Sequence, residues 1–128
     1  HGEWAWRMAG RDAKHDAGLF QTVKVAPGAR LHLRAHAHAW TSVNDDATLS
    51  QGQQKYLLRV GIDPEGGKDP AAPGVAWSKP LESVDRWAAL EAAAEAKGEA
   101  VTVFLRGTAE AAVKHNESCW DYVTLTAE

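Results

Sequence analysis

Two histidines, His36 and His38, stand two residues apart, and this spacing could support chemistry. On an extended strand the side chains at i and i+2 point the same way, so both imidazoles would project from one face. A His-x-His pair in this arrangement suits zinc, copper or iron. The pair could equally belong to a sugar-binding surface or to an ordinary solvated face.

A metal site built on this pair needs further ligands. A cupin-type site would have a glutamate a few residues beyond the pair, where this sequence has Ser42 and Val43. A copper site could combine a free amino-terminal His1 with another histidine. A small copper- or zinc-dependent enzyme using His1, His36 and His38 is therefore one alternative. We favour a polar sheet face that is solvated or contacts a ligand.

Arginines and aromatic residues share the apparent non-core faces of several predicted strands. Aromatic rings can bind the C–H faces of sugars, and arginine and histidine can bind sugar hydroxyls. We therefore predict carbohydrate contacts from Arg34, His36, His38, Trp40, Arg59, Arg106, Trp120 and Tyr122. Trp40 and Trp120 would stack on sugar rings. The faces are assigned by alternation, so a shift of one residue would reverse them, and these aromatics could instead pack beneath loops.

Acidic residues offer a weaker indication of calcium. Two Gly-, Asn- and Pro-rich stretches carry Asp45, Asp46, Asp63, Glu65 and Asp69, but neither has the spacing of an EF-hand, and such acids are usually turn formers. Asp121 differs, because it shares alternation parity with Val123 and Leu125. A carboxylate that points into a sandwich needs a partner, which could be calcium or an arginine.

The elements that would position these residues are mostly strands. Alternating or β-branched patterns cover residues 18–25, 30–40, 55–62, 101–106 and 120–126, and Gly- and Pro-rich turns separate them. Short strands with such turns are typical of an antiparallel sandwich or barrel. Residues 85–100 are ambiguous, because Ala and Glu favour a helix while the segment also alternates like a strand.

Composition limits the classes of function. We expect residues 1–128 to form one domain, and the net charge of −3 provides no basic field for nucleic acid. No apolar run reaches the length of a membrane span, so no membrane-spanning segment is expected. The single Cys119 excludes an intrachain disulfide, and its nearness in sequence to His115 does not make a catalytic triad. Six tryptophans indicate a binding surface in addition to a core.

Four segments, which run in order and cover well over half of the chain, resemble bacterial extracellular β-sandwich modules similar to jelly-roll carbohydrate-binding modules. They are residues 15–31, 37–46, 58–78 and 101–125, and their most particular stretches are VGIDPEGGKDP and KHNESCWD. The resemblance implies a galactose-binding-like jelly roll of two antiparallel sheets, with residues 87–94 as a strand. It also implies an acid on the last strand that helps to bind a structural calcium. Asp121 matches that position, while Tyr122 replaces a second acid.

The expected function is therefore that of a non-catalytic module that binds polysaccharide or oligosaccharide. Such a module would belong to a larger, extracellular protein and would contact that protein's other domains. Carbohydrate binding rests on the analogy of fold and on the aromatic residues. Besides the metal-dependent enzyme, a structural or adhesion domain that binds no sugar is a further alternative.

Overall fold

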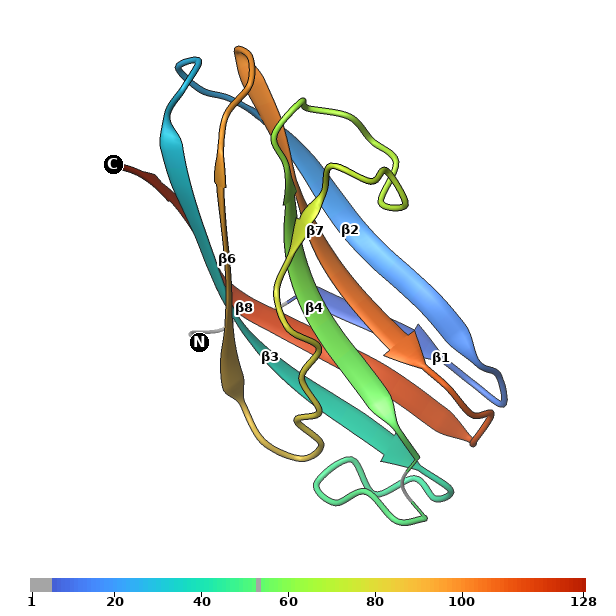
Figure 1. The fold of residues 1–128 in the computed structure, drawn as a ribbon. Helices are drawn as coiled ribbons and strands as arrows, with labels where there is room; N and C mark the ends of the chain where they lie inside the picture. The colour runs from blue at the N-terminus through green and yellow to red at the C-terminus, as the bar shows by residue number, and fades with distance from the viewer. Residues whose placement is uncertain (1–5, 53) are drawn as a thin grey trace.

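The strands of this protein form two antiparallel sheets that pack face to face (Figure 1). The computed structural model describes residues 6–52 and 54–128. Over these residues the strands are β1 (Trp6–Gly10), β2 (His15–Lys24), β3 (Arg30–Ser42), β4 (Tyr56–Asp63), β5 (Ala76–Trp77), β6 (Ala88–Glu95), β7 (Ala100–Ala109) and β8 (His115–Ala127). One sheet has the order β1-β8-β3-β6 and the other β2-β7-β4-β5. The predicted all-β jelly-roll sandwich is confirmed.

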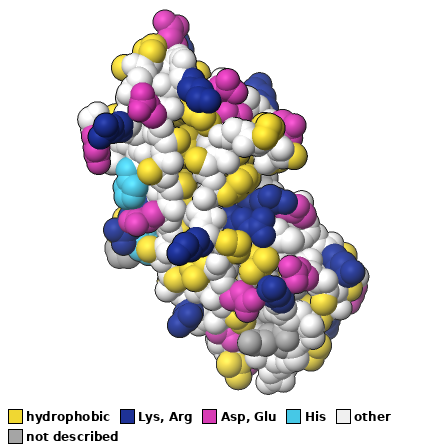
Figure 2. Space-filling model, in the orientation of Figure 1, with side chains coloured by type: hydrophobic (Ala, Val, Ile, Leu, Met, Phe, Trp, Pro, Cys, Tyr) yellow, Lys and Arg dark blue, Asp and Glu magenta, His cyan; other side chains and the backbone are white. Residues whose placement is uncertain are grey.

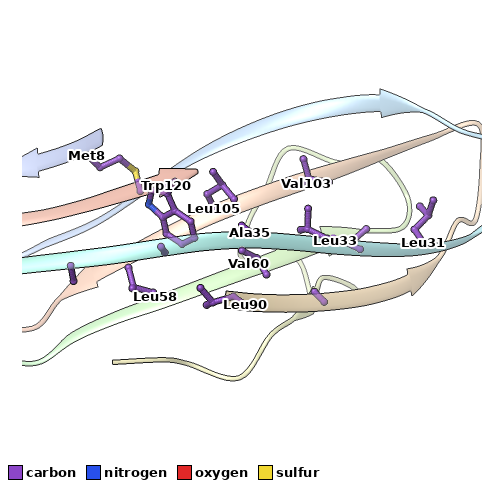
Figure 3. Close-up of a cluster of buried hydrophobic side chains, with 14 of the residues drawn as sticks. Met8, Leu31, Leu33, Ala35, Leu58, Val60, Leu90, Val103, Leu105 and Trp120 are labelled. Atoms are coloured by element: carbon purple, nitrogen blue, oxygen red, sulfur yellow. The ribbon is translucent and has the colours of Figure 1, made fainter. Parts of the chain in front are cut away.

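Strand β3 shows how alternation builds the core. Leu31, Leu33 and Ala35 are buried between the sheets, whereas Arg34 is exposed on the opposite face of the same strand. Figure 3 shows these side chains meeting Leu58, Val60, Val103 and Leu105 of the other sheet. The prediction that Leu33 and Ala35 face the core while Arg34 faces outward is therefore confirmed. None of the described segments forms a helix long and apolar enough to cross a membrane.

A β-bulge in β8 changes which residues of that strand face inward. Asp121 pairs with His36, but Thr124 is the next β8 residue paired with β3, opposite Arg34. Two residues of β8 therefore oppose one of β3, and Tyr122 has a positive φ of 51°. Before the bulge the even-numbered residues point inward, and after it the odd-numbered residues do.

The bulge shows that two of the predictions from the sequence are wrong. Trp120 is fully buried in the core, so it cannot stack on a sugar as predicted. Asp121 pairs with the outward-facing His36 and lies on the outer face of its sheet, so its predicted inward direction is also wrong. The expectation assumed unbroken alternation along residues 120–126, and one additional residue reverses it. The inward direction of Leu125, beyond the bulge, agrees with the prediction.

The Ala- and Glu-rich segment forms strand β6 at the edge of its sheet. Leu90 and Ala92 point into the core, and Glu91 and Glu95 point to solvent. The strand pairs along its whole length with β3, from Arg30 opposite Glu95 to Ala37 opposite Ala88. Tertiary packing thus overrides the helix propensity of alanine, as the resemblance had implied for residues 87–94.

Candidate functional site

A groove of about 260 Å³ lies on the outer face of the β2-β7-β4-β5 sheet. It is bounded by strands β2 and β7, by Trp77 of β5, and by Pro70 and Ala71 of the loop between β4 and β5. Figure 2 shows the face turned to the viewer in Figure 1, with hydrophobic side chains around a central cluster of Lys and Arg. Hydrophobic walls with a few polar groups are typical of ligand sites.

Trp77 packs directly on the backbone of the neighbouring strand. It pairs with Gly61 of β4, and a Cβ on that glycine would lie 2.6 Å from a Trp77 ring carbon. The ring also contacts Phe104, with ring centroids 5.8 Å apart. Glycine therefore provides the space that holds the indole against the sheet, and the indole has a fixed position before any ligand arrives.

Arg106 and Asp16 supply the charged part of the groove. The Arg106 guanidinium lies 5.5 Å from the Trp77 ring centroid, which is a cation–π geometry. Arg106 donates from Nε and Nη2 to both oxygens of Asp16, at 2.8 and 2.6 Å. Thr108 donates a third hydrogen bond to Asp16, and the bonds from Arg106 are the main reason that the pKa of Asp16 is lowered. This network fixes the orientation of both side chains.

Phe20 forms an exposed wall of the groove. Its side chain is 54% exposed, and its ring centroid lies 6.2 Å from that of Phe104. Phe104 itself is buried beneath Trp77 and Phe20 although it points outward from its sheet. The groove therefore combines a supported aromatic floor with one aromatic ring that is accessible to a ligand.

A second cluster lies on the outer face of the β1-β8-β3-β6 sheet. The His36 ring lies 5.7 Å from Tyr122, and the His38 ring lies 5.5 Å from Trp87. Burial lowers the pKa of His38. Arg34 lies 3.7 Å from Glu91 in an exposed ion pair. Tyr122 and Trp87 are each 49% exposed, so this face also presents aromatic rings to solvent.

The eight predicted ligand residues therefore do not share one surface. Four of them, Arg34, His36, His38 and Tyr122, lie on the outer face of the β1-β8-β3-β6 sheet. Two lie on the outer face of the other sheet, where Arg59 and Arg106 pair across β4 and β7. Trp120 is in the core, where its indole N–H donates to Ser118 at 3.0 Å. The two outer faces are on opposite sides of the sandwich, so no single ligand surface unites these residues.

Trp40 points outward but is covered. His115 stacks on its ring at 4.5 Å between centroids, and Trp40 is only 8% exposed. His115 donates to Asp45 at 2.7 Å, and Lys114 also bonds this carboxylate, which lowers its pKa to about 2. These bonds fix the loop after β3 against β8. The prediction that Trp40 stacks on a sugar is therefore wrong for this arrangement of the chain.

Sequence reasoning missed three groove residues. Asp16 and Phe20 share a face of β2 with Gly18. The predicted alternating segment 18–25 includes Phe20, but Asp16 precedes it. Trp77 follows the Gly- and Pro-rich loop in the short apolar stretch GVAWS. Only the pairing of β5 with β4 places it over Gly61, and no local pattern indicates that pairing.

The described residues do not include a group of three or more His, Cys, Asp or Glu side chains placed to hold a metal ion. Asp121 accepts a hydrogen bond from the backbone N–H of Tyr122 at 2.8 Å. Calcium takes backbone and water oxygens as well as carboxylates, so the predicted site at Asp121 stays a prediction. His1, the third ligand of the copper alternative, lies outside the described residues.

No protein-family model matches this chain, and no curated protein matches it. A solved structure described as "CBM4 structure and function" is similar, with a TM-score of 0.60 and 16% sequence identity. The likeness covers 97% of this chain and 84% of that one. It shows that the two share the jelly-roll β-sandwich fold over nearly the whole length of this chain.

Proposed function

We propose that this protein is a non-catalytic carbohydrate-binding module and that its sugar site is the groove beside Trp77. The observation that carries the proposal is the arrangement of Phe20 and Trp77 next to the fixed Arg106–Asp16 pair. Aromatic rings pack on the C–H faces of a sugar, and the charged pair can bond its hydroxyls. The similar structure, described as a carbohydrate-binding module, supports the proposal of carbohydrate binding.

The energetics suit a binding site. Each aromatic ring that stacks on a sugar contributes about 0.5–1.5 kcal/mol beyond area burial, by analogy with aromatic pairs. Trp77 and Arg106 are already fixed by Gly61 and Asp16, so little side-chain entropy is lost when a ligand binds. We further propose that the module belongs to a larger extracellular protein and contacts that protein's other domains.

The test is affinity electrophoresis against a panel of plant and bacterial polysaccharides. We expect at least one polymer to retard the protein, and we expect Trp77→Ala and Phe20→Ala to abolish the retardation. Trp87→Ala and Tyr122→Ala are matched controls, because they remove exposed aromatic rings from the opposite face. If only the controls lose binding, the site is the face of Arg34, His36, His38 and Tyr122. If no polysaccharide retards the protein, the proposed function is wrong.

Calcium at Asp121 and zinc or copper at His36 and His38 stay predictions from the sequence. Metal analysis of the purified protein tests them directly. Stoichiometric copper or zinc that His36→Ala removes would favour the metal-dependent enzyme, and calcium that Asp121→Asn removes would favour the structural site.

A further inference from the structure

We propose that the groove recognises an acidic polysaccharide, and that Arg59 binds the carboxylate of its uronic acid units. This inference rests on the proposed sugar site and names the class of its ligand. Arg59 lies on β4 directly opposite Arg106 of β7, and both side chains point outward from the same sheet. The proposal follows from how the charges of these two arginines are compensated.

Asp16 is the carboxylate near both guanidinium groups, but among the described residues its hydrogen bonds from arginine come from Arg106 alone. Both oxygens of Asp16 accept hydrogen bonds from Arg106, and Oδ1 also accepts one from Thr108. Arg59 forms no ion pair with any of the described residues. Two cations and one anion leave an excess of one positive charge beside the groove. Like charges directly opposite each other on a sheet are destabilising, so a second anion here would be stabilising.

The Nε atom of Arg59 also lacks a partner among the described residues. Its Nε is buried and has no hydrogen-bond acceptor within the part of the chain that the structure describes. A buried donor that lacks an acceptor is unfavourable. Because Nε itself is covered, a ligand carboxylate would bond the terminal Nη groups of Arg59. The planar guanidinium matches a carboxylate bidentately, as Arg106 already does with Asp16.

The position of Arg59 places this charge next to the aromatic contacts. Its partner Arg106 lies over Trp77 in the groove, and Arg59 is close enough to Asp16 to contribute to the lowered pKa of that carboxyl. A sugar ring on the aromatic residues could therefore direct a carboxylate towards Arg59.

The experiment compares acidic polysaccharides with neutral forms of the same backbone. Polygalacturonate, alginate and glucuronoxylan are each measured by isothermal titration beside their carboxyl-reduced counterparts. We expect the acidic form of at least one polymer to bind about 10- to 100-fold more tightly, as for a hydrogen bond to a charged group. Arg59→Gln should remove this preference, and Arg59→Lys should keep part of it, because lysine retains the charge but not the fork.

Arg34→Gln is the control, because it removes an equal charge from the opposite face. Equal binding of acidic and reduced polymers, with Trp77→Ala still abolishing it, would overturn this inference and leave the proposed function intact. Tighter binding of dextran sulfate than of every uronate polymer would overturn the assignment to a carboxylate. A protein that binds none of these polymers or the panel above would overturn both proposals. Thermal unfolding of Arg59→Gln checks that the variant is folded.

Discussion

At the scale of single residues, Gly61 is the position on which the proposed site depends most directly. An alanine Cβ there would lie 2.6 Å from a Trp77 ring carbon, so the indole would have to move. We expect Gly61→Ala to weaken polysaccharide binding about as much as Trp77→Ala. Titration calorimetry measures the affinity, and tryptophan fluorescence reports the change around the ring.

A matched substitution separates this effect from a general effect of alanine. A Cβ at Gly98 would meet nothing within 4 Å, so Gly98→Ala should leave both affinity and fluorescence unchanged. If Gly61→Ala binds as tightly as the unsubstituted protein, Trp77 does not need its position against Gly61 of β4, and the geometry proposed for the groove is wrong.

Trp120 and Tyr122 differ in burial although only one residue separates them. Trp120→Ala should lower the free energy of unfolding by about 3–5 kcal/mol, because it removes a fully buried side chain. Tyr122→Ala should change it by less than about 1 kcal/mol, because half of that side chain is exposed. Urea denaturation measures both values, and similar losses for the two variants would contradict the bulge in β8.

At the scale of elements, the residues of β3 and β8 show what alternation predicts and where it fails. The alternation of residues 30–40 correctly placed Leu33 and Ala35 in the core. The same rule failed on β8, because a bulge is set by pairing with β3, and residues 120–126 alone do not indicate it. The groove was missed for a related reason, since the pairing of β5 with β4 is not visible in local sequence.

Strand β6 consists of residues whose intrinsic propensity favours a helix, although the segment forms a strand. Its alanines favour a helix, but Leu90 and Ala92 are buried only when the segment pairs with β3. We expect a synthetic peptide of residues 85–98 to show helical circular dichroism in trifluoroethanol and no β-strand signal in water. A peptide that forms strand structure alone would show that its own sequence, and not packing, determines the strand.

At the scale of the whole molecule, acid should destabilise the protein in two ranges of pH. Burial lowers the pKa values of His15 and His38 below 6.5, so protonation favours the unfolded chain and stability falls as pH decreases through this region. Asp16 and Asp45 have pKa values below 3.8, about 2 for Asp45, so their stabilisation is lost as pH falls from about 4 towards 2.

Thermal unfolding between pH 7 and pH 2 tests this expectation. His38→Gln should make the melting temperature depend less on pH in the upper range, because it removes a group that titrates there. Asp45→Asn should have the same effect in the lower range. A melting temperature that stays constant from pH 7 to pH 5 would contradict the effect of the two histidines.

The stability of the protein should also fall in alkali, because Tyr56 is buried. Its hydroxyl lies 2.6 Å from His15 Nε2, and burial raises the pKa of Tyr56 to about 12. Between pH 10 and 12 the unfolded chain therefore loses this proton while the folded protein retains it, so stability falls as pH rises, by up to about 2–3 kcal/mol. Tyr56→Phe should be less stable at pH 7, because it loses the hydrogen bond, but should show a smaller decline above pH 10. Urea denaturation at several pH values measures both effects. An equal alkaline decline in Tyr56→Phe would mean that other groups, and not this phenol, limit stability in alkali.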